Sequence, residues 1–351
     1  MEKRIIAVLF GGCSTEHEIS LQSAHAVLSH IDRSVCVPLP VGITREGQWF
    51  LYNGPLERIP DGRWESEGSC LPCLISPDRT KRELLVFGGS AIHYRLDAAF
   101  PVLHGKNGED GTVQGLLELA GIPVIGCGCL SSALCMDKDR AHRLVSLAGI
   151  AVPKGVVLPS SAPDSAWKHA AEEVGYPLFV KPVRSGSSFG IARIAQPDKL
   201  LPAVREAAAH DEEVILEQAV PGFEVGCAVM GNDKLTVGLV DEIELSGGFF
   251  DFEEKYTLKT SSIHCPARIP AKKAEEIREA AKIIYRALGC RGFARVDMFL
   301  TPEGKILFNE VNTIPGFTSH SRYPNMMKGI GISFGELVGR LIALGTEEAG
   351  R

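Results

Sequence analysis

The chain begins with an alternation of apolar strand patterns and helical patterns, which constrains its fold more than any other feature. Arg4–Phe10 is a continuous apolar run that two glycines end, and a helical pattern follows over Ile19–His30. Leu96–Leu103 is a second buried-strand pattern, and it leads through a glycine-rich loop into a helical pattern over Thr112–Ala120. Strands that alternate with helices predict an α/β unit with a parallel, doubly wound sheet.

Local signals add detail to this first unit. Thr15 with Glu18 three residues later is a capping-box pattern, which predicts that the first helix starts there. Residues 45–95 are rich in Gly, Pro and Arg and show only weak strand patterns. Further strand candidates in this unit are Val35–Ile43, Gln48–Tyr52 and Glu83–Phe87.

The pattern changes near Asp137, where a charged amphipathic helix over Asp137–Ala148 begins. Short strands packed on helices then predict an α+β module, with strands at Leu178–Pro182, Ile191–Ile194 and Val214–Gln218 and a helix at Lys199–His210. From Phe223 onward strand patterns dominate until a helix over Lys273–Leu288, which Gly289 should terminate. The 351 residues suit two or three domains at roughly 150 residues each.

Composition excludes several classes of protein. Hydrophobic residues make up 45% and charged residues 23%, so wholesale disorder is excluded. The net charge of −6, without a basic block, argues against a nucleic-acid partner. Leu119–Met136 carries no charge, but Pro123 and several glycines favour a buried strand and loop over a membrane helix. With no signal-peptide pattern at the start, we expect a cytoplasmic protein with no membrane partner.

The ten cysteines do not resemble a disulfide framework in a chain of this length. Cys70 and Cys73 form the only spaced pair, with no second pair and no histidine at zinc spacing. A chance pairing in a surface segment is therefore favoured over a metal or redox role.

The sharpest cluster of chemical groups lies in a predicted β-hairpin, in which two apolar runs flank the loop Thr-Pro-Glu-Gly. If Leu300 pairs with Lys305 across the loop, Arg295 lies opposite Glu310, and Asp297 lies opposite Phe308. Strand alternation then places four polar residues on one face: Arg295, Asp297, Glu310 and Asn312. Their oxygen donors suit Mg²⁺ shared with nucleotide phosphates, whereas an exposed face with cross-strand ion pairs is an equally good geometric alternative.

A second set of residues favours the nucleotide interpretation. Lys181 lies at a strand end before a Gly/Ser loop rich in backbone N–H donors, which could fold over phosphates, although such loops are common. Lys138 and Lys255 lie on separate segments, and Glu217 and Glu224 flank a Pro-Gly turn at an expected domain junction. With the acidic hairpin, these residues predict a triphosphate held between two small modules.

Seven motifs occur in the order and spacing found in D-alanine–D-alanine ligases, and together they cover essentially the whole chain. They are Phe10–Ser20, His104–Gly111, Met136–Lys138, Lys181–Gly190, Glu254–Tyr256, Arg295–Asp297 and Asn309–Gly316. The resemblance implies an ATP-grasp fold with an N-terminal α/β domain (1–135) and central (136–221) and C-terminal (222–351) α+β domains that clamp ATP. It also implies an Ω-loop near residues 242–262 and a homodimer.

The resemblance implies roles for individual residues. Asp297, Glu310 and Asn312 match the ligands of two Mg²⁺ ions, with Mn²⁺ as a substitute. Lys138, Lys181 and Lys255 match the lysines that contact ATP phosphates, and Glu217 and Glu224 match the adenosine-binding pair. Glu16 matches the partner of the first D-alanine's ammonium, and His104 borders that subsite. Ser187 and Tyr256 match a hydrogen-bonded pair, Arg295 and the Gly316 N–H match oxyanion donors, and Ser321 matches the hydroxyl that binds the second substrate's carboxylate.

The second subsite suggests a subfamily. Arg322 stands where D-alanine–D-alanine ligases of basal metabolism usually carry an apolar residue, and this arginine is typical of vancomycin-resistance ligases. Tyr256 is retained, unlike in the D-lactate enzymes, so the chain resembles D-alanine–D-serine ligases of the VanG type. Asp241 and Phe250 align with residues that shape the serine subsite, whereas His17 departs from the arginine of many relatives.

Three rival interpretations remain open. The first is a D-alanine–D-alanine ligase of basal metabolism that tolerates Arg322, and the second is another ATP-grasp carboxylate–amine ligase. The third is a catalytically inactive ATP sensor, which should lack a metal ligand or a phosphate-binding lysine. D-alanine-dependent ATP turnover separates an enzyme from a sensor.

Overall fold

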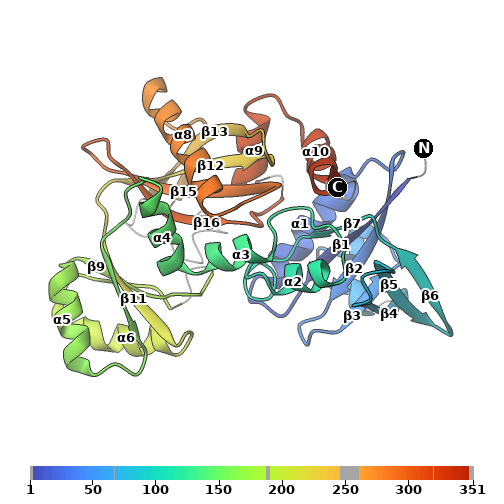
Figure 1. Cartoon of the computed structure of the whole chain (residues 1–351), viewed down its shortest axis with the longest axis horizontal. Helices are drawn as coiled ribbons and strands as arrows, with labels where there is room; N and C mark the ends of the chain where they lie inside the picture. The colour runs from blue at the N-terminus through green and yellow to red at the C-terminus, as the bar shows by residue number, and fades with distance from the viewer. Residues whose placement is uncertain (1–2, 67, 187–189, 246–260, 319, 348–351) are drawn as a thin grey trace.

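The computed structural model describes residues 3–66, 68–186, 190–245, 261–318 and 320–347 (Figure 1). The first sheet has seven strands in the order β6-β5-β4-β3-β2-β1-β7. The bounds are β1 Arg4–Gly11, β2 Cys36–Ile43, β3 Trp49–Tyr52, β4 Cys70–Ile75, β5 Glu83–Gly88, β6 Ser90–Arg95 and β7 Ala98–Pro101.

Only the centre of this sheet is parallel, so the expectation of a fully parallel, doubly wound sheet is wrong. β1 pairs in parallel with β2 and β7, whereas β2 to β6 form an antiparallel meander. The connection from Ile43 to Trp49 is a short turn closed by hydrogen bonds between Thr44 and Gln48. So short a connection has no room for the helix that a parallel crossover needs.

The helices between β1 and the second sheet are α1 (His17–His30), α2 (Thr112–Leu119), α3 (Cys129–Met136) and α4 (Lys138–Leu147), with short 3₁₀ turns at Leu56–Arg58 and Arg63–Ser66. The predicted capping box is wrong, because Glu16 occupies the N-cap position of α1 without a side-chain capping bond. Glu18 pairs with Arg45 instead. The uncharged segment before Met136 ends in a helix and not in the expected loop. In the described part of the chain, we find no helix with the length and apolarity needed to span a membrane.

The second sheet is four-stranded and antiparallel, in the order β10-β9-β11-β8. Its elements are β8 Gly155–Pro159, α5 Asp164–Val174, β9 Leu178–Pro182, β10 Ala192–Ile194, a 3₁₀ turn at Pro197–Lys199, α6 Leu200–Ala208 and β11 Glu213–Gln218. Residues of α5 and α6 share one core with the sheet, including Trp167 and Val204. The predicted strands and α6 are confirmed, whereas the sequence patterns missed β8 and α5.

The third sheet has five antiparallel strands in the order β14-β13-β12-β15-β16. Its elements are β12 Phe223–Met230, β13 Thr236–Leu245, β14 Ser261–His264, α8 Ala271–Ala287, β15 Phe293–Leu300, β16 Ile306–Asn312, α9 Arg322–Lys328 and α10 Phe334–Thr346. Gly289, at φ +68°, follows the end of α8 as predicted. Tyr285 of α8 and Val296 of β15 lie in one core.

One hydrophobic core joins the N-terminal sheet to the C-terminal segment. Phe100 of β7 contacts Phe293 and Phe317, with ring centroids 6.0 and 6.2 Å apart. α10 lies beside the N-terminal sheet in Figure 1, and its residues Leu337 and Leu341 belong to the same core. This packing holds residues from both ends of the chain in fixed positions around the site described below.

All ten cysteines are free, which confirms that the chain is not a disulfide framework. The segment that holds Cys70 and Cys73 is not an irregular surface loop, because both lie on β4 and the Cys73 side chain is buried in the sheet core. Burial raises the pKa of Cys73 to about 12, so the thiol stays protonated and unreactive near neutral pH.

Candidate active site

A cavity of about 450 Å³ lies where the three sheets meet, and most of the described predicted site residues line it. Those residues are Glu16, His104, Lys138, Glu224, Arg295, Asp297, Glu310, Asn312, Gly316, Ser321 and Arg322. Lys181, Glu217 and Asp241 lie outside its lining. Ser187, Phe250, Lys255 and Tyr256 lie outside the described residues.

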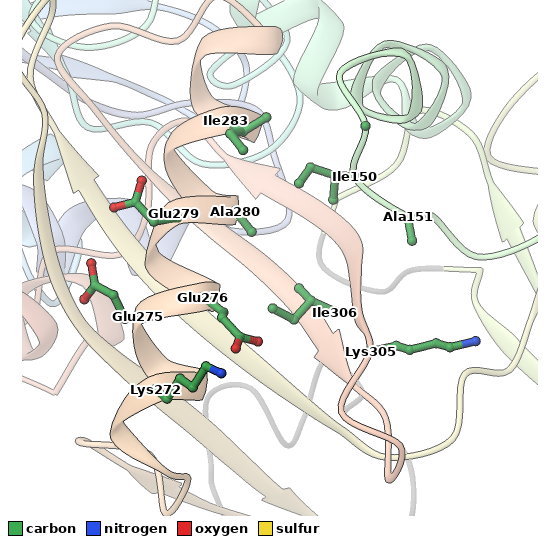
Figure 2. Close-up of a pocket in the computed structure, with 11 residues that line it drawn as sticks. Ile150, Ala151, Lys272, Glu275, Glu276, Glu279, Ala280, Ile283, Lys305 and Ile306 are labelled. Carbon is green, nitrogen blue, oxygen red and sulfur yellow. The ribbon is translucent and has the colours of Figure 1, made fainter.

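A second hollow, of about 660 Å³, lies between α8 and the β15–β16 hairpin (Figure 2). Ile150, Ile283 and Ile306 form its apolar part, and Lys272 and three glutamates of α8 line it as well. None of the described predicted site residues lines it. The smaller, more polar cavity is therefore the candidate active site.

The predicted hairpin is confirmed, but its register differs from the expected one. Asp297 lies opposite Glu310 and Arg295 opposite Asn312, because an irregularity between Asp297 and Met298 leaves Asn309 unmatched. The extra residue keeps the polar side chains of both strands on one face, where they line the cavity. The backbone carbonyl of Asn309 lies 3.0 Å from His142 Nε2, a contact that a local strand pattern does not indicate.

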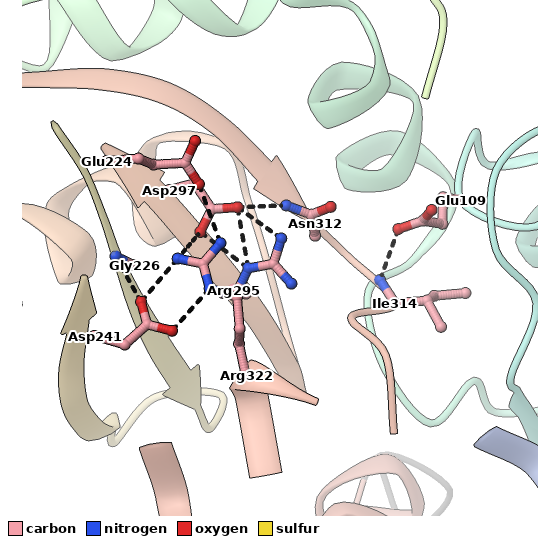
Figure 3. Close-up of polar contacts among 9 residues, drawn as sticks. All are labelled: Glu109, Glu224, Gly226, Asp241, Arg295, Asp297, Asn312, Ile314 and Arg322. Atoms are coloured by element: carbon pink, nitrogen blue, oxygen red, sulfur yellow. Dashed lines mark hydrogen bonds and ion pairs between the residues drawn. The ribbon is translucent and has the colours of Figure 1, made fainter. Parts of the chain in front are cut away.

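Two arginines and three carboxylates form a compact charge cluster at one end of the cavity (Figure 3). Arg295 donates to both oxygens of Asp297 from Nε, at 2.9 and 3.0 Å, and Asn312 Nδ2 donates to the same carboxylate at 2.9 Å. Arg322 Nη2 lies 3.3 Å from Asp297 Oδ1. Asp297 is only 1% exposed, so these partners compensate a charge that is almost wholly removed from water.

Arg322 is the centre of this cluster. Its Nε and Nη2 donate to the two oxygens of Asp241 at 2.7 Å each, and Nη1 donates to Glu224 at 3.0 Å. Although burial opposes the charge, Asp241 and Asp297 hold the pKa of Arg322 well above its ordinary value. A Cβ atom at Gly226 would lie 2.2 Å from Arg322 Nη2, so only glycine permits this close approach.

The lysines and glutamates predicted to bind nucleotide fall into separate contacts. Lys181 pairs with Glu217, which is 2% exposed and lies 3.9 Å from His142 Nδ1. Burial opposes the Glu217 charge, but Lys181 and His142 hold its pKa below the ordinary value. Lys138 Nζ donates to the Ser185 carbonyl at 2.7 Å, at the edge of the Gly/Ser loop.

Glu16 lies at the N-terminus of α1, where the helix dipole favours a negative charge. Its backbone N–H donates to Ser14 Oγ at 3.2 Å, and the carboxylate lines the cavity. Gly105, at φ +70°, approaches so closely that a Cβ atom there would lie 2.7 Å from Glu16 Oε2. The glycine-rich loop therefore closes directly over the predicted ammonium partner.

Sequence reasoning missed Glu109, which also lines the cavity. Its carboxylate accepts the Gly105 N–H at 2.9 Å and the Ile314 N–H at 3.2 Å, as Figure 3 shows for Ile314. Burial, with a smaller contribution from the Glu16 charge, raises the pKa of Glu109 to about 8. The sequence signal that could have identified Glu109 as a site residue is its position as an acidic residue inside a glycine-rich loop.

The donor set of the hairpin suits a hard cation. Asp297 and Glu310 offer carboxylate oxygens, and the Asn312 amide oxygen points away from Asp297 (Figure 3). No cluster of three His, Cys, Asp or Glu side chains among the described residues is arranged to hold a metal ion. Two carboxylates and one amide are too few ligands to enclose a metal ion fully. They suit Mg²⁺ whose remaining coordination positions are taken by phosphate oxygens.

The sheets and the polar cavity between them correspond to a known class of ligase. Residues 5–127 match the family described as D-ala D-ala ligase N-terminus, and residues 144–343 match D-ala D-ala ligase C-terminus. The chain therefore belongs to the D-alanine–D-alanine ligase family, with the ATP-grasp fold of that family.

Individual relatives narrow the comparison. The crystal structure of VanG D-Ala:D-Ser ligase from Enterococcus faecalis is 56% identical, with a TM-score of 0.92, and covers 98% of this chain and 100% of that one. A D-alanine–D-alanine ligase of Caldicellulosiruptor bescii is 46% identical over 99% of this chain and 96% of its own length. The vancomycin B-type resistance protein VanB of Enterococcus faecalis is also 46% identical, over 99% of this chain and 100% of its own length.

Proposed function

We propose that this protein is an ATP-dependent ligase that joins D-alanine to D-serine through an acyl phosphate. The product would end peptidoglycan precursors in a form with low affinity for vancomycin. The observation that carries the proposal is Arg322, which lines the cavity next to Ser321 and is held by the buried Asp241, at a position where an apolar residue would suit D-alanine. The similarity to VanG D-Ala:D-Ser ligase supports the same choice.

In the first step, Glu16 holds the ammonium of D-alanine while the D-alanine carboxylate attacks the γ-phosphorus of ATP. A new P–O bond forms and ADP leaves. Lys138, Lys181 and Lys255 bind the phosphates, and Glu217 and Glu224 bind the adenosine. Asp297, Glu310 and Asn312 would hold Mg²⁺, which neutralises phosphate charge when bound.

In the second step, the amine of D-serine attacks the acyl carbonyl, a C–N bond forms and inorganic phosphate leaves. Arg295 and the Gly316 N–H donate to the oxygen that becomes negative, which is the usual way to lower such a barrier. Ser321 binds the carboxylate of the second substrate. The resemblance assigns Ser187 and Tyr256, which lie outside the described residues, to the hydrogen-bonded pair of the family.

Selectivity for D-serine would come from a preorganised polar subsite. Asp241 holds the Arg322 guanidinium in one orientation, so Arg322 does not reach freely into the cavity. A buried polar group that a substrate hydroxyl satisfies is left unpaired by an analogue that lacks the hydroxyl. The resemblance gives Phe250, which lies outside the described residues, a part in shaping this subsite as well.

A competition assay with equal D-alanine and D-serine tests the proposal. We expect kcat/KM for D-serine at the second subsite to exceed that for D-alanine by at least ~10-fold, or ~1.4 kcal/mol. Removal of both charges in the double variant Asp241→Leu/Arg322→Leu should narrow or reverse the preference and change D-alanine use at the first subsite little. Arg340→Leu on the exposed face of α10 is the matched control.

If D-alanyl-D-alanine dominates in the wild type, the protein is a D-alanine–D-alanine ligase of basal metabolism, as the Caldicellulosiruptor relative is named. That outcome would overturn the choice of D-serine but not the assignment to the D-alanine–D-alanine ligase family.

We also propose that the protein is a cytoplasmic homodimer. Light scattering of the purified protein tests the dimer, and fractionation of cells tests the location.

A further inference from the structure

Residues of the N-terminal unit hold a short segment of the C-terminal unit at three backbone atoms. Glu109 accepts the Ile314 N–H at 3.2 Å, and His104 Nδ1 lies 2.9 Å from the Ile314 carbonyl oxygen. Ser23 Oγ accepts the Phe317 N–H at 3.2 Å. The segment 314–317 is therefore bracketed on both sides of Gly316.

Ser23 and His104 form one relay, because Ser23 Oγ lies 3.2 Å from His104 Nε2. The Ile314 carbonyl can only accept, so His104 Nδ1 carries a proton and Nε2 accepts from the Ser23 hydroxyl. Burial lowers the pKa of His104, which keeps the ring neutral in this tautomer near pH 7. Ser23 thus donates once and accepts once, and both bonds lead to the 314–317 segment.

The position of Gly316 depends on the residues that flank it. Pro315 precedes it, and a Cβ atom at Gly316 would lie 2.8 Å from Ser321 Oγ, so this turn lies directly against the residue predicted to bind the second substrate. Ser321 Oγ in turn accepts the Thr318 N–H at 2.9 Å. Bonds at Ile314 and Phe317 therefore limit how the Gly316 peptide can rotate.

We infer that Ser23 is a positioning residue, which acts through His104 and Phe317 to aim the Gly316 N–H at the acyl carbonyl oxygen. This inference rests on the proposed function. Ser23 is completely buried on α1, outside the cavity lining, and nothing in its local sequence indicates a part in catalysis. Through this relay, ligation depends on Ser23 of α1, which is 294 residues away in the sequence from its partner Phe317.

The two reaction steps separate positioning from general destabilisation, because the tetrahedral oxyanion forms only when the second amino acid attacks. Ser23→Ala should lower the kcat of dipeptide formation by about 10-fold or more, less than the loss of an oxyanion donor itself. The D-alanine-dependent scrambling of ¹⁸O between the bridging and non-bridging positions of ATP, which reports acyl phosphate formation, should change by less than about 3-fold.

Ser20→Ala is the matched control, since Ser20 is an equally buried serine on the same helix. Its hydroxyl bonds Val102 and Gly11 inside the N-terminal unit and not the 314–317 segment. We expect both rates of this variant to stay within about 3-fold of wild type. If Ser23→Ala unfolds at the assay temperature, Ser23→Cys replaces it, because a thiol of similar size fills the same space but is only a weak hydrogen-bond donor and acceptor.

A parallel loss of scrambling and dipeptide formation in Ser23→Ala would overturn the inference and leave Ser23 a structural residue. Dipeptide formation equal to that of Ser20→Ala would overturn it as well. Failure of the wild type itself to scramble ¹⁸O with D-alanine would instead contradict the proposed function. The two failures are therefore distinguishable.

Discussion

Arg322 and Asp241 form a two-bonded ion pair, with Nε–Oδ2 and Nη2–Oδ1 distances of 2.7 Å, although 81 residues separate them. The pair joins the start of α9 to β13 and brings Glu224 and Asp297 into the same cluster. Arg322 is therefore held back against the sheet by carboxylates and does not extend freely into the second subsite. Changes to either partner should affect stability as well as substrate choice.

The first prediction concerns this pair. Asp241→Leu leaves a buried guanidinium short of its main partner and should lower the free energy of unfolding by about 3–5 kcal/mol. The double variant Asp241→Leu/Arg322→Leu should lose less than the sum of the two single variants, because it leaves neither charge unpaired. Urea denaturation measures the free energy of unfolding of the two single variants and of the double variant. Arg340→Leu, which breaks an exposed pair, should change stability by no more than about 0.5 kcal/mol. Additive losses would show that the two residues act independently.

The second prediction concerns the metal ligands. Glu310→Ala should abolish ligation with little effect on the fold, because Glu310 faces the cavity and not the packed side of the hairpin. ATP turnover at saturating Mg²⁺ and the thermal midpoint provide the measurements. Glu303→Ala, in the exposed loop of the same hairpin, should keep full activity. Near-wild-type turnover in Glu310→Ala would mean that the metal assignment is wrong.

The third prediction concerns the first D-alanine. A buried carboxylate that faces a substrate ammonium contributes about 2–5 kcal/mol. Glu16→Gln should therefore weaken D-alanine binding at the first subsite by about 30-fold or more and leave ATP affinity nearly unchanged. Titration calorimetry with each ligand measures the two affinities. Glu18→Gln, two residues away and paired with Arg45 at the surface, is the control. Equal losses of both affinities would indicate a structural role at the start of α1.

The fourth prediction is a pH dependence that follows from Glu109. Its pKa of about 8 in the folded protein lies above the ordinary value of 4.5, mainly because the group is buried. Between these values the folded state keeps a proton that the unfolded state loses, so the stability contributed by Glu109 is complete below pH 4.5 and is lost as the pH rises toward 8. The slope approaches about 1.4 kcal/mol per pH unit.

Glu109→Gln cannot titrate, so its stability relative to wild type should rise steadily between pH 5 and pH 8. Denaturant unfolding of both proteins without ligands at several pH values tests this. Glu303→Gln, at an exposed position whose pKa is lowered, should run parallel to wild type over the same range. A constant difference between Glu109→Gln and wild type would refute the raised pKa.

Local patterns in the sequence predicted much of the secondary structure and one face of the site. The alternation of side chains along two apolar runs is a property of the strand itself, so Arg295, Asp297, Glu310 and Asn312 were assigned to one face correctly. The register was not predictable in the same way. The irregularity at Asn309 depends on packing against other elements, including His142 of α4.

The sequence by itself determined the family, the hairpin face and the glycine-rich loop, because each depends on residues close together in the chain. Only the tertiary structure decided that Asp241 holds Arg322, that Glu109 bonds Ile314 and that Ser23 reaches Phe317. These pairs come from elements 81 to 294 residues apart. Their meeting depends on how the sheets and α1 pack around one core, since strand and helix periodicity sets which way a side chain points on its own element but not which distant residue it meets.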